Sequence, residues 1–292
     1  RTGGVYSCPI SLDQSDCRRI NLDLIEDMWL GVAVASQGPP GGRVLACAHR
    51  FIKLYGAFHL RHMIGRCYLR GNDLQYDDSD MHWQNPDQVC SGEVMCSVGV
   101  SASISQTQVV LGSPGSYDCH QLIFPFNVFS VVGYSVIQAE RLLSQQVETI
   151  VTDARGSVML ALKHLDRLLI GQTLRGEQTG SYFGNAVAAA DLDNDGWSDL
   201  LVGAPFYFHR QQEVGGAVYV YMNAGGRFDP QPSVVLRGPA GSAFGMAVCA
   251  TGDLNQDGFQ GENRTSGTPA DWFFGRHHCS AEVNNSTQQK QQ

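Results

Sequence analysis

One nine-residue stretch of the sequence, "DLDNDGWSD", is unusually rich in aspartate. Its aspartates stand at positions one, three, five and nine: Asp191, Asp193, Asp195 and Asp199. With Gly196 at position six, this is the start of the D-x-[DN]-x-[DN]-G pattern of calcium loops, where glycine permits a sharp turn and oxygen atoms converge on a hard cation. We expect the backbone carbonyl of Trp197 to supply the position-seven ligand. An all-oxygen ligand set favours Ca²⁺ over zinc or copper, whereas the plainer alternative is a solvated acidic turn.

The flanks of this stretch indicate strands rather than helices. Position twelve, where a helix-loop-helix calcium site carries a bidentate glutamate, is Val202. The runs "NAVAAA" before the loop and "DLLVGAP" after it are short, apolar and bounded by Gly and Pro. The sequence therefore predicts that the ion clamps a strand-loop-strand turn.

A second copy of the unit lies downstream. Residues 180–199, "GSYFGNAVAAADLDNDGWSD", align with residues 241–260, "GSAFGMAVCATGDLNQDGFQ", with Gly252 as one extra residue. The second loop repeats the predicted ligand set with Asp253, Asn255, Asp257 and the carbonyl of Phe259. Its position nine is Gly261, which offers no carboxylate, so we expect weaker binding or an incomplete site.

The repeat spacing of about sixty residues is typical of propellers and other repeat folds. Between the copies, strands are expected near 185–190, 200–203, 216–222 and 233–236, and a four-stranded antiparallel meander per repeat is a propeller blade. Fainter copies begin in "WLGVAVASQ", "CSVGVSASI" and "VVGYSVIQ" upstream. The fold class predicted is all-β, a partial propeller whose chain opens inside a blade at "GGVYSCP".

The motifs around these loops resemble a known family. The Phe-Gly pairs at 183–184 and 244–245 and the Gly-Ala-Pro at 203–205 resemble the FG-GAP repeats of integrin alpha subunits. "EDMWLGVAVASQGPPGGRVLACAHR", "RCYLRGNDL" and "EVGGAVYVYMN" are similar to the laminin-binding subgroup. The resemblance covers residues 1–260 apart from one poor stretch. It implies a seven-bladed propeller, of which this chain holds roughly blades one to five, the first and last incomplete.

The resemblance also implies a function. A receptor head of this kind pairs with an integrin beta subunit and binds an extracellular-matrix ligand of the laminin type on the outer side of the plasma membrane. Its signal peptide and single membrane span are expected outside this sequence. The calcium loops would brace the face opposite the ligand, while Trp29, Phe183 and Phe244 would occupy Phe-Gly positions around the axis, where the beta subunit docks. Plain packing between blades remains the alternative for these aromatic residues.

The cysteine pairing follows from the same resemblance. It implies three local disulfides, Cys8–Cys17, Cys47–Cys67 and Cys90–Cys96, since connectivity does not follow from sequence alone. Cys119, Cys249 and Cys279 are left over. We interpret Cys249 as a small buried hydrophobe on a strand.

Composition fits an all-β protein with many turns. Charged residues make up 16%, and 33 of the 292 residues are glycine, which suits a fold with many turns. The net charge of −8 indicates no basic face for nucleic acid. No run of eighteen apolar residues occurs in this sequence.

Two stretches depart from the family pattern. "CHQLIFPFNVFS" (119–130) is much shorter than the corresponding segment between blades, where the family tunes its laminin preference, and "AERLLSQQVETI" (139–150) has a period compatible with a helical turn. After Gln260 the next strand is missing, and residues 261–292 form a polar, aperiodic tail that we expect to be non-homologous and disordered. Asn263, Asn284 and Asn285 would be glycosylation acceptors only in a secreted tail.

The alternative function is the FG-GAP propeller of a secreted calcium-binding hydrolase. The nine histidines, however, stand in no nucleophile-elbow, HExxH or Cys/His signature. The sequence therefore predicts no catalytic residue. The domains encoded downstream of the last blade in the complete gene would separate a receptor from a hydrolase.

Overall fold

The computed structural model describes most of the chain in twelve stretches. These are residues 2–9, 14–22, 24–38, 42–56, 60–72, 95–116, 120–123, 127–131, 133–153, 156–164, 167–209 and 214–250. Within them the regular elements are strands and one 3₁₀ turn, η1 (Gln14–Asp16). The all-β prediction is confirmed.

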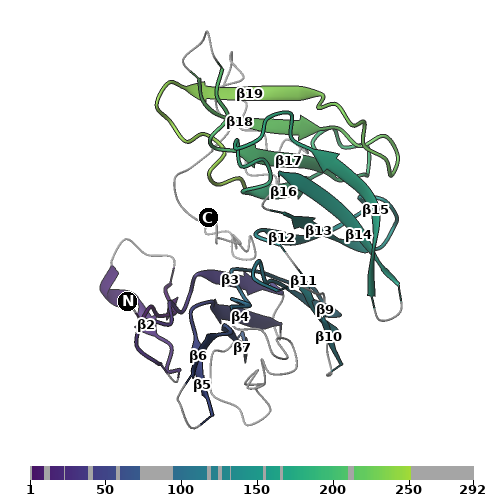
Figure 1. Cartoon of the computed structure of the whole chain (residues 1–292). Helices are drawn as coiled ribbons and strands as arrows, with labels where there is room; N and C mark the ends of the chain where they lie inside the picture. The colour runs from purple at the N-terminus through teal and green to yellow at the C-terminus, as the bar shows by residue number, and fades with distance from the viewer. Residues whose placement is uncertain are drawn as a thin grey trace, which may run out of the picture.

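Two successive four-stranded antiparallel sheets contain the predicted loop and its neighbour (Figure 1). The first consists of β12 (Val136–Glu140), β13 (Val147–Thr152), β14 (Ser157–His164) and β15 (Arg167–Arg175). The second consists of β16 (Val187–Ala190), β17 (Asp199–Ala204), β18 (Val214–Tyr221) and β19 (Val234–Pro239). Both run in chain order as simple meanders, which confirms the blade predicted between the two sequence copies. Residues 141–146 connect β12 to β13 as a hairpin loop, so the helical period of that stretch is misleading.

The other sheets come from the N-terminal half. They comprise β1 (Tyr6–Ser7) with β2 (Arg18–Arg19); β3 (Ala33–Ser36), β4 (Arg43–Ala48) and β7 (Arg66–Gly71); β5 (Ile52–Tyr55) with β6 (Leu60–Met63); and β8 (Ser101–Ile104), β9 (Gln108–Gly112), β11 (Asn127–Val131) and β10 (His120–Ile123).

The last of these sheets departs from the predicted antiparallel meander. β11 pairs in parallel with β9, and β10 lies at the outer edge. β10 pairs antiparallel with β11, so β10 runs opposite to both β11 and β9. This is the stretch where the sequence is shorter than the family pattern.

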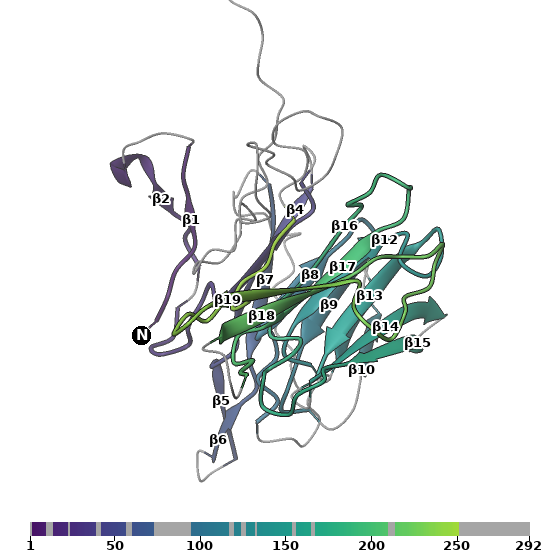
Figure 2. The ribbon, with the colours of Figure 1, turned by 90° about the horizontal axis from the view of Figure 1, so that it is seen from above.

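The first strands of successive sheets lie side by side. β3 contacts β8, β8 contacts β12, and β12 contacts β16, and Figure 2 shows β12 beside β16 from a second direction. Neighbouring first strands are what blades around a common axis require. The predicted partial propeller is therefore confirmed for the described part.

Blade junctions recur with the same geometry. Isolated parallel bridges join Gly3 to Leu30, Gly65 to Val98 and Gly216 to Phe244. Gly216 has φ +88°, and a Cβ there would lie 2.3 Å from the carbonyl oxygen of Phe244. Only glycine lets the two backbones approach this closely.

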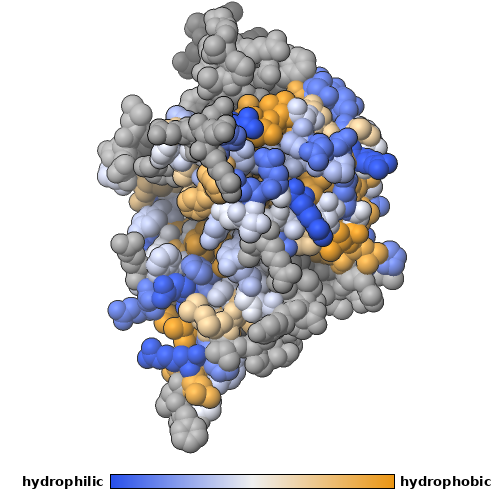
Figure 3. All heavy atoms as spheres, turned by 45° about the horizontal axis from the view of Figure 1, so that its top comes forward, coloured by the Kyte–Doolittle hydropathy of each residue, from blue (hydrophilic) through white to orange (hydrophobic). Residues whose placement is uncertain are grey.

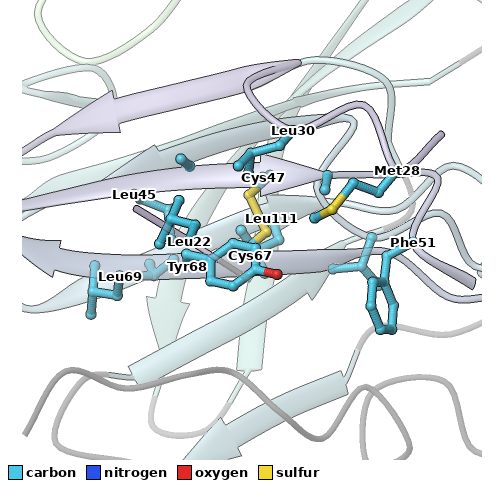
Figure 4. Packing of buried hydrophobic residues seen from close by; sticks show 14 of the residues in the cluster. Leu22, Met28, Leu30, Leu45, Cys47, Phe51, Cys67, Tyr68, Leu69 and Leu111 are labelled. Atoms are coloured by element: carbon cyan, nitrogen blue, oxygen red, sulfur yellow. A yellow bond between two sulfur atoms is a disulfide. The ribbon is translucent and has the colours of Figure 1, made fainter. Parts of the chain in front are cut away.

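The buried side chains form layers between the sheets. One cluster surrounds the Cys47–Cys67 disulfide and includes Met28, Leu45 and Tyr68 (Figure 4). A second cluster packs the β12–β15 sheet against the β16–β19 sheet through residues such as Leu160 and Phe183. These layers hold the hairpin loops of adjacent blades at fixed positions.

Candidate metal centre and the opposite face

The predicted cation loop connects β16 to β17. Its ends are fixed because Ala190 pairs with Asp199 across the antiparallel ladder. In the described part of the chain, Asp191, Asp193 and Asp195 bring one carboxylate oxygen each within 4.8 Å of the others. Calcium binds oxygen at about 2.3–2.6 Å, so two ligands of one ion lie at most about 5 Å apart. These three carboxylates therefore fit a single hard cation.

Backbone amides orient the three carboxylates. The amides of Asp195 and Gly196 donate to the two carboxylate oxygens of Asp191, at 3.1 and 2.9 Å. The amide of Trp197 donates to Asp195 at 2.8 Å. Gly196 has φ +90° with open space around it, so its role is the backbone conformation that glycine adopts readily. The chain is thus folded into the tight turn that the motif predicts.

Asp199 lies at the base of this loop rather than within the trio. Its side chain is buried and accepts hydrogen bonds from the amides of Leu192 and Asn223, each at 2.8 Å. Burial is the main cause that raises its pKa to about 6, with a smaller contribution from the charges of Asp193 and Asp195, while the two hydrogen bonds oppose the rise. Cation ligation by Asp199 and by the carbonyl of Trp197 stays a prediction.

A positive charge has a physical role here. Three carboxylates at this spacing repel one another, and a fourth is buried a few residues away. A divalent ion would offset two of the three negative charges of the trio and favour the ionised form of Asp199. The oxygen-only donor set matches calcium or magnesium rather than a softer metal.

The second predicted site falls outside the described residues. Asp253, Asn255, Asp257 and Phe259, and the tail 261–292, belong to that part of the chain. Their predicted roles therefore stay predictions.

Two of the predicted disulfides are confirmed. Cys8 bonds Cys17 and Cys47 bonds Cys67, with Cα atoms 4.2 and 4.0 Å apart. Cys96 is also disulfide-bonded, while its predicted partner Cys90 lies outside the described residues.

Cys249 is disulfide-bonded as well. Its interpretation as an unpaired hydrophobe is therefore wrong. The buried-strand pattern around it carries no information about whether a thiol finds a partner in space.

The aromatic residues at the blade junctions need one correction. Leu30, not Trp29, makes the junction bridge that Phe244 makes downstream. Gly31 and Gly184 share the same φ of +91°, and Trp29 and Tyr182, two residues earlier, have φ of +60° and +57°. Trp29 is therefore the counterpart of Tyr182, one residue before the Phe-Gly position.

Burial separates these aromatic residues further. Phe183 is 1% exposed and packs edge-on against Tyr219 and Tyr221, whereas Tyr182 is 63% exposed. Phe244 is half-buried. Phe183 therefore fits the alternative of plain packing between blades. The exposed aromatic residue beside it is Tyr182, which the sequence analysis did not single out.

Two exposed rings, Tyr182 and Phe206, lie at the end of their blade opposite the cation loop, while Trp29 precedes the first strand of another sheet. Tyr182 contacts Phe206 edge-on, with ring centroids 5.2 Å apart, and Phe206 follows the far end of β17. Trp29 donates its indole N–H to Asp27 at 2.9 Å, and Arg50 lies over its ring at 5.2 Å. β17 spans about 17 Å at about 3.3 Å per residue, so the two ends of the blade are well separated.

Fold and loop together define a cation-binding FG-GAP propeller. The model of the FG-GAP repeat matches residues 183–221, which contain the first loop. Integrin alpha-3 of Mus musculus is 43% identical over 302 residues, covering 89% of this chain and 28% of the relative. Integrin alpha-7 of Rattus norvegicus is 34% identical over 315 residues (89% and 27%), and integrin alpha-6 of Gallus gallus is 34% identical over 330 residues (94% and 30%).

The chain belongs to the integrin alpha family over this matched segment, and it spans less than a third of the length of these relatives. Because the relatives are integrin alpha subunits, the hydrolase alternative is rejected. No helix in the described stretches is long and apolar enough to cross a bilayer.

Proposed function

We propose that this chain forms part of the extracellular head of a cell-surface adhesion receptor. In this proposal a calcium-braced propeller pairs with an integrin beta subunit and binds an extracellular-matrix ligand of the laminin type. The observation that carries the proposal is the 43% identity to an integrin alpha-3 over 89% of the chain. The similarity to alpha-7 and alpha-6 supports the same receptor class. Membrane anchoring is assigned to segments outside this sequence.

Calcium in this proposal braces the blade rather than contacting the ligand. The three-carboxylate loop lies at one end of β17, and the exposed Phe206 lies just beyond the other end. A cation at the first end reduces the repulsion within the trio and fixes the hairpin loop. The ligand-contacting metal is assigned to the beta subunit, which leaves the opposite end free for docking.

The beta subunit is proposed to dock on the exposed aromatic residues at that opposite end. Exposure favours Trp29, at 36%, and its counterpart Tyr182 over the buried Phe183, while Phe244 remains a half-buried candidate. In Figure 3 the apolar surface is broken into separate areas among polar side chains, so the docking residues have to be identified individually. Exposed rings held in place are frequent anchors of protein interfaces.

The test is co-expression of the complete receptor with an integrin beta subunit. Tyr182→Ala combined with Phe206→Ala should lower the amount of heterodimer recovered by immunoprecipitation of the beta subunit. Interface anchors cost about 2 kcal/mol or more when truncated, which corresponds to roughly thirtyfold weaker pairing. Ile170→Ala is the matched control, because Ile170 is 60% exposed on the outer strand β15.

Ligand binding completes the test. Heterodimers that contain the parent chain should bind immobilised laminin in a cation-dependent manner. Unchanged pairing in the double variant would contradict the docking face, and a heterodimer with no affinity for any laminin would contradict the ligand class.

A further inference from the structure

Three hairpin loops meet at one buried side chain, Asn223, directly after β18. Its Nδ2 donates to the carbonyl of Leu142 at 2.8 Å and to the carbonyl of Ser198 at 2.9 Å. Its Oδ1 accepts from the amides of Gly226 and Arg227, at 2.8 and 3.1 Å. One amide group thus joins the cation loop, the loop 141–146 of the preceding blade and the β18–β19 loop.

Asn223 also fixes the end of the cation loop. Its backbone amide donates to the buried carboxylate of Asp199, and its side chain holds the carbonyl of Ser198. Ser198 is further attached to the preceding blade, because its amide donates to the backbone carbonyl of Arg141 at 2.9 Å and its hydroxyl donates to the backbone carbonyl of Glu140 at 2.7 Å. The last two residues of the loop are therefore positioned from outside the loop.

The loop of the preceding blade is closed by a protein carboxylate instead of an acidic trio. Glu148 is fully buried and accepts from the amides of Leu142 and Ser144, at 3.1 and 2.8 Å, and from the Ser144 hydroxyl. Glu148 opposes Ala139 in the β12–β13 ladder, as Asp199 opposes Ala190 in the β16–β17 ladder. Residues 141–146, "RLLSQQ", contain no acid. This loop is therefore ordered without a cation of its own.

We propose that Asn223 is a positioning residue that couples cation binding in the 191–199 loop to the preceding blade. The loop closed by Glu148 is the cation-independent anchor of this coupling. The inference rests on the proposed cation site and adds its wider effect: the ion orders the junction between two blades as well as its own hairpin. By linkage, a change that loosens the loop 141–146 lowers the affinity for the cation, and cation binding makes opening of that loop less favourable.

Terbium luminescence tests the proposal on the secreted ectodomain of the complete protein. Terbium(III) replaces calcium at oxygen sites and is excited by a nearby indole. Trp197 lies inside the first loop, whereas the second loop has Phe259 at the same position. The signal lost in Trp197→Phe therefore reports the first loop alone, and calcium competition against it gives the calcium affinity.

Asn223→Ala should weaken both terbium and calcium at this loop by about tenfold or more, the usual effect of removing a residue that orients metal ligands. Gln172→Ala is the matched control. Gln172 also bridges the preceding blade to the β18–β19 loop, through a 2.6 Å bond to the carbonyl of Phe228 and a 3.1 Å bond from its amide. Its side-chain hydrogen bonds go to Phe228 and not to 191–199, so its loss should leave the cation affinity unchanged.

Hydrogen exchange on the unmodified protein gives a second readout that needs no variant. Calcium should slow exchange of the Leu142 and Ser144 amides, which lie outside the cation loop. Unchanged exchange there, or parent-like affinity in Asn223→Ala, would overturn the coupling while leaving the cation site intact. A missing Trp197-dependent signal in the unmodified protein would instead overturn the cation site itself.

Discussion

Phe183 packs its ring edge-on against Tyr219, with centroids 5.1 Å apart and planes at 77°. Phe183 begins one blade and Tyr219 lies on its third strand, and both belong to the cluster shared with the preceding blade. The Phe-Gly pair thus uses its ring to fill the core and its glycine to turn the chain. The preceding residue, Tyr182, is exposed instead, and the docking proposal assigns it the contact with the beta subunit.

Truncation of Phe183 is therefore expected to act on stability. Phe183→Ala removes a fully buried ring and should lower the free energy of unfolding by about 3–5 kcal/mol. Tyr182→Ala removes a largely exposed ring and should lower the free energy of unfolding by well under half of that amount. Chemical denaturation of the receptor head, monitored by tryptophan fluorescence, measures both. An equal decrease in the free energy of unfolding in both variants would contradict the assignment of Phe183 to the core and Tyr182 to the surface.

The cation loop predicts a calcium-dependent stability. Extracellular sites of this kind bind at about 10⁻⁴ to 10⁻³ M, so millimolar calcium should add on the order of 1 kcal/mol to the free energy of unfolding. Asp195→Ala removes one carboxylate of the trio and should reduce that increment. Calorimetry with calcium and with chelator measures the difference. Asp229→Ala, an exposed acid on the β18–β19 loop, should leave the increment unchanged.

The glycine at the blade junction gives a third prediction. Gly216→Ala places a Cβ 2.3 Å from the carbonyl oxygen of Phe244 and also forces alanine to a φ of +88°. Gly225 has φ +69° with no atom within 4 Å of an added Cβ, so Gly225→Ala isolates the backbone strain of about 1–2 kcal/mol. Gly216→Ala should cost clearly more than this, as measured by thermal unfolding. If the two variants lost similar amounts of stability, the backbone at the blade junction would be able to shift and accommodate the added Cβ.

The Cys47–Cys67 disulfide joins the paired strands β4 and β7 within the N-terminal core cluster. It closes a loop with a sequence separation of 20 residues. Chain-entropy arguments assign such a bond about 3 kcal/mol. Cys47→Ser combined with Cys67→Ser should therefore lower the melting temperature and the secreted yield of the receptor head. A secreted double variant with parent-like melting would show that the surrounding core suffices.

The cation loop, the strands of its blade and the repeat architecture could be predicted from the sequence, because they depend on local interactions. The aspartates at 191–199 and Gly196 specify a tight oxygen-lined turn because each contact in it spans only a few residues. The apolar runs around the loop give the strands of its blade, and the recurrence of the unit gives the repeat architecture. The family resemblance added the Cys8–Cys17 and Cys47–Cys67 pairs, which local patterns alone leave open.

Tertiary structure decided what joins these units. Asn223 reaches Leu142 across a sequence separation of 81 residues, and no pattern around "VYVYMN" marks that contact. The burial of Phe183 likewise depends on Tyr219, which lies on another strand of the assembled blade. The bonded state of Cys249 and the parallel pairing of β11 with β9 are also unmarked in the local sequence. Local sequence determined the turn and its strands because their hydrogen bonds are local. Packing between blades decided the rest, since only the assembled sheets bring those groups within reach of one another.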